Sequence, residues 1–269
     1  MVTIDVVLPN YNRMSLLRRA VESVLLQEHI GVIYIVDDGS NSETINYYEK
    51  LLQLSTSIVL IRDSHSGDPG RLRYLGIQNS EAEWIAFLDS DDYWEPARMT
   101  QIWESLNDPK LNLYCSNAKK IFENSSTPEG LYLSERPSKR FRLQDLLVEN
   151  FVITSTAIVR RSALLKVGGF PFGKDVKNCE DFAAWLRLST LQGCLFDSSA
   201  NVVYSYSKSS YSRNLQKDLD IKAFSDLSRW VWKSEISRIR QLEIYCLVFR
   251  VRAIRSIRGM KTKIRVARL

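Results

Sequence analysis

The first 120 residues alternate short apolar runs with segments of helical period. Each run predicts a buried strand, and after the first three come segments whose apolar residues recur at steps of three and four. The runs are TIDVVL, GVIYIV, SIVLI and WIAFL, which begin at residues 3, 31, 57 and 84. A mostly parallel sheet with crossover helices requires this alternation, so the pattern predicts an α/β fold.

Polar clusters follow three of these runs at the points where the predicted strands end. They are PNYNR after the first run, DDGS after the second and DSDDYW after the fourth, which leads into a helix expected to start near Pro96. In open α/β sheets, ligands bind outside the carboxyl ends of the strands. The three clusters are therefore expected to converge on one cleft.

The pattern changes after residue 120. Residues 123–140 are polar, rich in Ser and Pro and without period, which predicts a mobile loop. A strand, a short helix, a glycine stop and a longer helix follow, the last with inward residues Phe182, Trp185, Leu186 and Leu188. We predict one domain over 1–215, built from two halves, 1–120 and 140–215.

Charge separates the C-terminal segment from this domain. The 269-residue chain carries a net charge of +6, but Arg229 to Leu269 hold twelve Lys and Arg against two acids, so the rest is net acidic. An apolar stripe recurs there at steps of three and four: Leu242, Cys246, Phe249, Ala253, Ile257, Met260 and Ile264. Residues 216–269 are therefore predicted to be helical, with a basic amphipathic helix at an anionic membrane surface and Trp230 and Trp232 as anchors. The alternative is that the stripe packs on the domain. No nucleic-acid-binding fold accompanies the charge, so no nucleic acid partner is expected.

The cysteines and the N-terminus bear on location. Cys115, Cys179, Cys194 and Cys246 are widely spaced without a CxxC pair, so reduced thiols are expected. The N-terminal segment lacks a secretion pattern, and no apolar run reaches the length of a membrane span. These features predict a cytoplasmic protein, peripheral on the inner face of the cell membrane.

Three carboxylates, Asp89, Asp91 and Asp92, stand directly behind the apolar run WIAFL. Like charges this close repel, and each desolvated carboxylate is costly unless something compensates it. A bound cation is one compensator, and the oxygen ligands suit Mg²⁺ or Mn²⁺. The alternative is an acidic loop that caps the next helix, a role that Asp92 fits.

Taken together, VVLPNYNR, IVDDGS, AEWIAFLDSDDYWEP and VGGF followed by CEDFAAWLRL resemble the family 2 glycosyltransferases of GT-A fold over about residues 3–206. The resemblance implies a metal-dependent, inverting hexosyltransferase with a nucleotide diphosphate sugar donor, most simply a UDP-sugar. The implied acceptor is a glycan, such as a lipid-linked cell-surface polysaccharide.

The resemblance also assigns roles on the donor side. It makes Asp91 the direct ligand of a Mn²⁺ or Mg²⁺ ion and places Asp89 by the metal or the donor ribose. Asp92 is then expected either to start a helix or to support the metal ligands from behind. It gives Asp38 the uracil N–H and lays Pro9 and Tyr11 along the nucleoside. An ordinary turn with capping aspartates remains the alternative for DDGS, and core packing remains the alternative for Tyr11.

Two further assignments concern an arginine and the catalytic base. Similarity makes Arg73 a donor contact, although Leu72 and Tyr74 depart from the family pattern and leave Arg71 as a competitor. It makes Asp181 the base that takes the acceptor hydroxyl proton, with Glu180 as its neighbour. The alternative is a pair of acidic helix caps.

One position departs from the family pattern near residue 207. Many relatives carry a histidine where this chain has Ser207. Either the metal site then relies on the aspartates, or Lys208 or Arg213 supplies positive charge to the diphosphate.

Two other function classes are weighed against this one. A nucleotidyltransferase should show a glycine-rich, lysine-bearing phosphate loop, and PNYNRMS has no glycine. A catalytically inactive binding protein of the same fold should have lost Asp91 or Asp181, and both are present.

Overall fold

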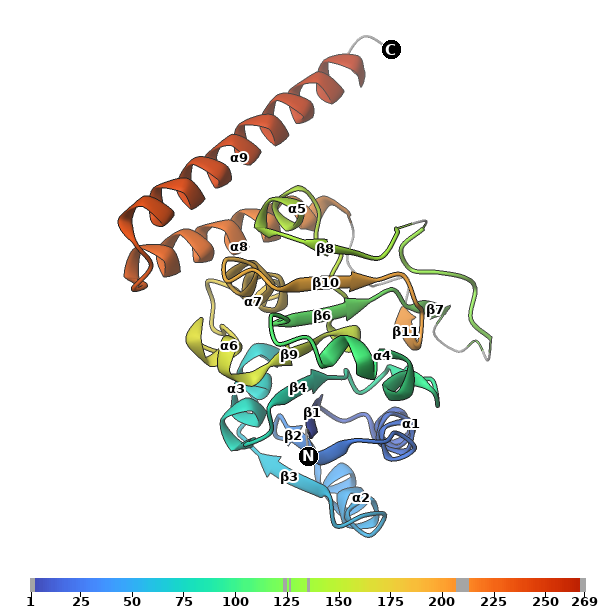
Figure 1. Ribbon diagram of the computed structural model, residues 1–269. Coiled ribbons are helices and arrows are strands. Elements are labelled where there is room, and N and C mark those ends of the chain that lie inside the picture. Colours follow the sequence, from blue (N-terminus) through green and yellow to red (C-terminus); the bar gives the residue numbers. More distant parts are fainter. Residues whose placement is uncertain (1–2, 123–124, 126, 135, 207–212, 267–269) are drawn as a thin grey trace.

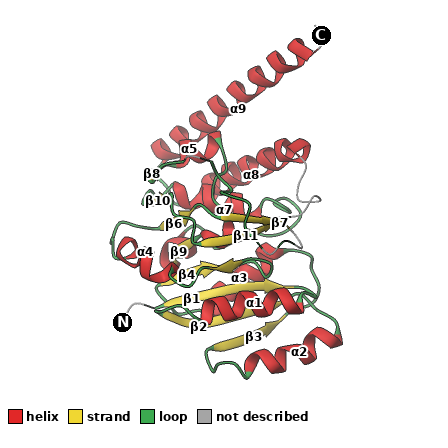
Figure 2. Ribbon diagram, turned by 90° about the vertical axis from the view of Figure 1, so that its right-hand side faces the viewer, coloured by secondary structure: helices red, strands yellow, loops and turns green. Residues whose placement is uncertain are grey.

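The computed structural model describes residues 3–122, 125, 127–134, 136–206 and 213–266. Within the two C-terminal helices, side chains are described for residues 218–253. Its elements form a three-layer arrangement in which a twisted sheet lies between two groups of helices (Figures 1 and 2).

The central sheet has eight strands in the order β3-β2-β1-β4-β9-β6-β10-β8. Pairing is parallel except where β9 meets β4 and β6 and where β8 meets β10. Strands from both predicted halves thus pair in one sheet. Their bounds are Ile4–Asn10 for β1, Ile30–Asp37 for β2, Ile58–Arg62 for β3, Trp84–Phe87 for β4, Leu113–Ser116 for β6, Lys139–Phe141 for β8, Ile158–Arg160 for β9 and Cys194–Asp197 for β10.

Buried residues on both faces explain why the strands read as continuous apolar runs. Along β1, Val6 belongs to the apolar cluster under α1 (Met14–Leu25), α2 (Ser42–Leu52) and α4 (Arg98–Leu106). Its neighbour Val7 belongs to the cluster on the other face. Successive side chains of a strand point to opposite faces. When both faces of the sheet are covered, every position of the strand is apolar, and the sequence shows no alternation of polar and apolar residues.

The second face is covered by the remaining helices. These are α3 (Pro69–Asn79), α5 (Leu143–Val148), α6 (Arg161–Lys166), α7 (Glu180–Ser189), α8 (Arg213–Lys233) and the first turns of α9 (Arg238–Val266). The four residues predicted to face inward from α7 are all buried. The helix expected near Pro96 begins two residues later, at Arg98.

A second, three-stranded sheet was missed by the sequence pattern. It consists of β5 (Tyr93–Trp94), β11 (Val202–Tyr206) and β7 (Lys119–Phe122), with β11 in the middle. Asp92 therefore precedes a short strand, so the first of its two predicted roles, the start of a helix, is wrong. The second role, a carboxylate that supports the metal ligands, stays a prediction.

Part of the stretch predicted as a mobile loop is held by specific bonds. The Asn117 side chain accepts a hydrogen bond from the Leu133 amide at 3.0 Å and donates one to its carbonyl at 2.6 Å. The Tyr132 amide donates to the carbonyl of Ala118. The last two residues of the same stretch, 139 and 140, belong to β8. The described residues of 127–134 thus fold back beside β7 and take a defined position.

Helix α9 (Arg238–Val266) leaves the body of the molecule after packing its first turns on it (Figure 1). Its buried side chains are Gln241, Ile244, Val248 and Val251. Leu242 and Phe249 of the predicted stripe are 64% and 74% exposed, and Cys246 and Ala253 are exposed as well. The helix therefore packs on the domain through a different face. Side chains of Ile257, Met260 and Ile264 lie outside the described residues.

No helix, over the residues described, is long and apolar enough to cross a membrane.

Candidate active site

The strand ends meet at one cleft of about 640 Å³. Its walls come from the ends of β1, β2 and β4, the start of α3 and the start of α7. All eight residues that the sequence predicts for the site line it: Pro9, Tyr11, Asp38, Arg73, Asp89, Asp91, Glu180 and Asp181.

Asp38 is held by the loop that follows β3. Its carboxylate accepts hydrogen bonds from the amide and hydroxyl of Ser66, both at 2.8 Å, and from the Gly67 amide at 2.9 Å. The ring Nδ1 of His65 lies 3.0 Å from the carboxylate. Gly39 has a φ of +71°, and a Cβ there would lie 2.7 Å from the His65 amide nitrogen. Glycine therefore allows the two loops to touch.

Tyr11 and His65 form the outer edge of this part of the cleft. Tyr11 is exposed, and its ring stacks on that of His65 with centroids 4.3 Å apart. A flat, partly solvated ring pair is a suitable surface for a nucleobase or ribose. His65 was missed because the sequence around it, SHSGD, carries no pattern that sets it apart.

Asp37, next to Asp38, has a structural role. It is fully buried and accepts hydrogen bonds from the Tyr48 hydroxyl at 2.6 Å and the Ser40 amide at 3.1 Å. These bonds fix the turn that presents Asp38.

Arg73 links the two acidic clusters of the cleft. Its guanidinium is buried, 2.6 Å from Asp89 and 3.5 Å from Glu180, and lies over the ring of Phe170. Arg71, its competitor, pairs instead with Asp63 at 2.5 Å and does not line the cleft.

Asp91 lies against the start of α1 and against β11. Its carboxylate pairs with Arg13 at 2.5 Å, and its carbonyl accepts hydrogen bonds from Arg19 and the Ser205 hydroxyl. Burial, followed by the charge of Asp89, raises the pKa of Asp91, while Arg13 opposes that rise. This part of the cleft therefore disfavours further negative charge unless a cation accompanies it.

Asp92 is fully buried beneath the cleft and does not line it. It accepts hydrogen bonds from the Ser155 hydroxyl at 2.5 Å and the Ser205 amide at 2.7 Å. Burial and its acidic neighbours raise its pKa well above the usual range. Asp92 thus ties the start of β5 to β11 and to η1 (Thr154–Thr156).

Glu180 and Asp181 open α7 and take different environments. Glu180 is buried, and its Oε2 atom has no hydrogen-bond partner. Burial, with the adjacent Asp181 charge, raises the pKa of Glu180 to about 7, and Arg73 limits the rise. Asp181 is half-buried and accepts a hydrogen bond from the Thr154 hydroxyl at 2.9 Å.

Metal binding can be tested against the residues present. Asp89 and Asp91 supply carboxylate oxygens to one cleft, but no group of three His, Cys, Asp or Glu side chains suited to a metal occurs within the described part of the chain. Mg²⁺ is typically held by one or two carboxylates together with substrate phosphates. The pair fits an ion that arrives with a diphosphate.

The described residues do not test the replacement of the usual histidine by Ser207. Ser207 and Lys208 lie outside the described residues, as does the side chain of Arg213. Arg13, Arg19 and Thr154 are contacts that sequence reasoning missed, although Arg13 stands inside the polar cluster PNYNR.

Comparison with known proteins decides the family. Residues 5–168 match the family model described as glycosyl transferase family 2. The chain belongs to this family.

Relatives of this glycosyltransferase are distant and longer. An uncharacterized glycosyltransferase of Rickettsia bellii is 26% identical over 189 residues, which cover 70% of this chain and 26% of that protein. Poly(ribitol-phosphate) beta-N-acetylglucosaminyltransferase TarS of Staphylococcus aureus is 24% identical over 185 residues, which cover 67% of this chain and 31% of TarS. The chain thus spans about a quarter to a third of the length of these relatives.

Solved structures give the same fold. S. aureus TarS 1–349 in complex with UDP-GlcNAc superposes with a TM-score of 0.69 at 17% identity, over 90% of this chain and 70% of that one. The mannosyltransferase PcManGT from Pyrobaculum calidifontis, in complex with GDP-Man and Mn²⁺, gives 0.59 at 14% identity, over 91% and 69%. The predicted GT-A fold is confirmed.

Proposed function

We propose that this glycosyltransferase moves a hexose from a UDP-sugar to a glycan hydroxyl with inversion at the anomeric carbon. The observation that supports the proposal is the cleft itself, which Asp38, Asp89, Asp91 and Asp181 all line. One cavity thus offers groups for a nucleoside, a diphosphate and an attacking hydroxyl.

On the donor side, Asp38 accepts the uracil N–H, and Tyr11 and Pro9 flank the nucleoside. An ionised carboxylate can accept but cannot donate, so it selects a base edge that presents a donor. The UDP and UDP-GlcNAc complexes of TarS support a uridine nucleotide. The Ser66 and Gly67 bonds hold the Asp38 carboxylate in one orientation before the donor arrives, and the uracil N–H would replace one of its present contacts, such as that of His65.

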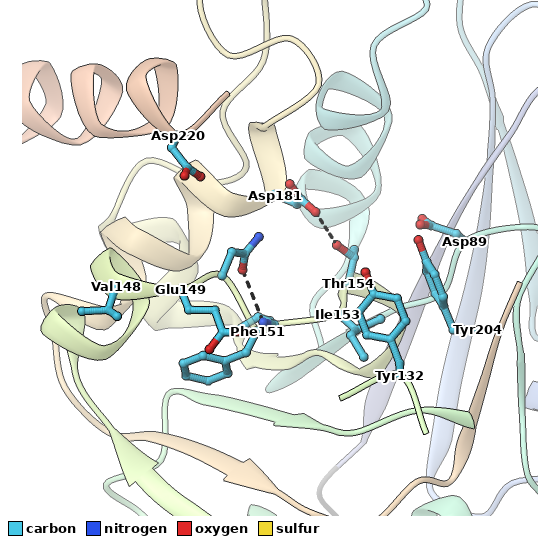
Figure 3. A pocket seen from close by; sticks show the side chains of 12 residues that line it. Asp89, Tyr132, Val148, Glu149, Phe151, Ile153, Thr154, Asp181, Tyr204 and Asp220 are labelled. Atoms are coloured by element: carbon cyan, nitrogen blue, oxygen red, sulfur yellow. Dashed lines mark hydrogen bonds between the residues drawn. The ribbon is translucent and has the colours of Figure 1, made fainter. Parts of the chain in front are cut away.

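Asp181 serves as the general base. Thr154 donates to one oxygen and so orients the carboxylate, while its position between the cleft and a second cavity of about 420 Å³ (Figure 3) lets it face an acceptor. The acceptor O–H proton passes to Asp181 as the new C–O bond forms at the anomeric carbon. The C–O bond to the β-phosphate breaks, and UDP leaves with the electron pair.

Asp91 and Asp89 would hold a Mn²⁺ or Mg²⁺ ion, which would neutralise charge on the departing diphosphate. Arg73 fixes Asp89 from behind and Arg13 stands beside Asp91. Both arginines line the cleft, so they can also approach phosphate oxygens.

A donor panel tests the function. We expect UDP with Mn²⁺ to raise the melting temperature more than CDP at equal concentration, because cytosine presents an acceptor where uracil presents an N–H, and one UDP-sugar to be consumed with a saccharide acceptor. Equal stabilisation by UDP and CDP would refute the role of Asp38. Binding of UDP without turnover of any UDP-sugar would favour an inactive binding protein. Diphosphate release from a nucleoside triphosphate would favour a nucleotidyltransferase.

Helix α9 supports a membrane-linked acceptor. The exposed stripe of Ile239, Leu242, Cys246 and Phe249 is flanked on the helix surface by Arg238 and Arg252 on one side and by Arg240 and Arg250 on the other, where Glu243 pairs with Arg240. Trp232 is exposed nearby with Arg238 over its ring, whereas Trp230 is partly buried against the core. An apolar stripe with basic flanks matches an anionic lipid interface. The proposed acceptor is accordingly a lipid-linked glycan at such a surface.

Liposome flotation tests this placement. Leu242→Glu with Phe249→Glu should release the protein from vesicles that contain phosphatidylglycerol, and added salt should weaken binding of the wild type. Both residues are exposed, so the fold should persist, whereas deletion of 238–269 would also remove the buried Ile244 and Val248. Leu26→Glu, at a 69% exposed leucine of the N-terminal half, is the matched control. If wild type ignores these vesicles at low salt, the membrane assignment fails.

A further inference from the structure

The nucleoside end of the cleft holds a side chain of the protein itself. The His65 ring stacks on the Tyr11 ring with centroids 4.3 Å apart and an angle of 23° between the ring planes. Its Nδ1 atom lies 3.0 Å from the Asp38 carboxylate. Tyr11, Asp38 and His65 all line the cleft. A flat ring therefore already contacts the two groups that the proposed function gives to uracil.

The ring also offers Asp38 the kind of group that uracil would offer. Two oxygens of Asp38 lie 3.0 Å from Nδ1, the carboxylate Oδ2 and the backbone carbonyl. An ionised carboxylate and a carbonyl both accept hydrogen bonds, so Nδ1 carries the ring proton and donates. Uracil likewise combines an aromatic face with an N–H in the plane of the ring. Imidazole resembles it in both respects.

Four donors already surround the Asp38 carboxylate. Ser66 donates to Oδ1 through its amide and its hydroxyl, the Gly67 amide donates to Oδ2, and His65 Nδ1 is the fourth. An ionised carboxylate has about four lone-pair sites. A uracil N–H must therefore displace one of these donors before it can bind Asp38.

The imidazole is the donor that can leave most easily. The His65 side chain is 53% exposed, so rotation about its Cα–Cβ bond carries the ring into solvent. The backbone beneath it is held in place, because the next two amides bind Asp38. It also lies so close to Gly39 that a Cβ there would be 2.7 Å from the His65 amide nitrogen. The ring can therefore move while the loop stays.

We propose that His65 occupies the nucleobase position in the nucleotide-free enzyme and that UDP binds by displacing it. The inference rests on the proposed function, because it takes Tyr11 and Asp38 as the uracil contacts. Exchange of the rings replaces one stack and one hydrogen bond by another pair of the same kind. The affinity for UDP is lowered in proportion to the fraction of molecules whose base site is filled. UDP-sugar and the product UDP are affected alike, so the ring also opposes retention of the product.

Substitution of His65 distinguishes a ring that competes with the base from a ring that supports it. With Mg²⁺ present, His65→Ala should bind UDP about ten-fold more tightly than wild type in calorimetric titration, because the base site is then open in every molecule. Pyrophosphate has no base and should bind wild type and variant alike. His29→Asn is the matched control and should bind UDP as wild type does, since His29 lies outside the cleft and asparagine tolerates its φ of +63°.

The outcomes separate this inference from the proposed function. UDP affinity that is unchanged or lower in His65→Ala overturns the inference and leaves the donor site standing. Equal tightening of UDP and pyrophosphate also overturns it, because the substitution would then act through the charge of the cleft. If UDP binds neither wild type nor His65→Ala, the proposed donor site fails and the inference fails with it.

NMR of the aromatic rings follows the displacement itself. The chain has two histidines, and the second, His29, stacks on Trp103 and serves as the internal control. Nuclear Overhauser contacts between His65 and Tyr11 should be present in the free protein. Saturation with UDP and Mg²⁺ should replace them by contacts between Tyr11 and uracil, while the His29 signals stay unchanged. Persistence of the contacts between His65 and Tyr11 in the UDP complex would make the ring a platform for the base and would overturn the proposal.

Discussion

The two walls of the cleft differ in how deeply their carboxylates are buried and how many groups hold them. On the proposed donor wall, Asp38 is buried and accepts three hydrogen bonds from Ser66 and Gly67, and Asp91 pairs with Arg13. On the proposed acceptor wall, Asp181 is half-buried, accepts hydrogen bonds from the Thr154 hydroxyl and the Phe182 amide, and lines a second cavity. Asp38 is therefore held more firmly before any ligand binds, whereas Asp181 is more accessible.

This difference follows from where the walls come from. The donor wall is built on the ends of parallel strands whose buried faces fix each loop, as at Asp37 beneath Asp38. The acceptor wall combines the N-terminus of α7 with segments that meet only in the folded chain, including residues 127–134 and η1. A rigid wall on strand ends suits a donor that stays the same, and a wall made of loops suits an acceptor that varies between related enzymes.

The largest effect is expected on the donor wall. Asp91→Asn, or addition of a chelator, should lower the transfer rate about 10³-fold and weaken UDP-sugar binding, because an amide cannot supply the anionic ligand that a hard cation needs. The measurements are steady-state transfer and calorimetric titration of UDP. Asp63→Asn, which changes an aspartate outside the cleft, is the control. Wild-type turnover in the presence of chelator would rule out metal dependence.

The acceptor wall should respond differently. Asp181→Asn should lower kcat about 10³-fold, within the range typical of a general base, while the dissociation constant for UDP stays within two-fold of wild type. The base acts on the acceptor and does not hold the nucleotide. The comparison of kcat with UDP affinity measures this separation. A parallel loss of UDP affinity would mean that the two walls are not distinct in function.

The sequence predicted much of the donor wall for a physical reason. Buried strands such as Ile4–Asn10 read as apolar runs, and the polar residues that follow them must lie at the sheet edge. It missed Ser155 and Ser205, which hold Asp92, because their proximity depends on a small sheet whose strand β5 has two residues. A two-residue strand has no period to detect.

Helix α9 shows again that sequence spacing does not predict tertiary contacts. The stripe of Leu242 and Phe249 was found because its spacing is helical, yet the face that packs is that of Ile244 and Val248. Helical spacing identifies an apolar face but does not say which neighbour covers it. With two apolar faces on one helix, tertiary contacts decide which of them is buried.

The smallest expected effect concerns the acid pair at the join of the two walls. Burial raises the pKa of Glu180 to about 7, so the folded protein binds a proton more tightly than the unfolded chain, whose glutamate has a pKa near 4.5. The free energy of unfolding therefore falls as pH rises from about 4.5 to 7 and levels off above that. Glu180→Gln removes this loss. Its free energy of unfolding should therefore exceed that of wild type by an amount that grows from pH 4.5 to 7 and reaches on the order of 2 kcal/mol. Urea unfolding at pH 5 and pH 8 measures the difference, with Glu22→Gln, an exposed glutamate paired with Arg18, as the control. A stability difference that does not change with pH would show that Arg73 keeps Glu180 ionised, and the acid pair would then carry two negative charges at neutral pH.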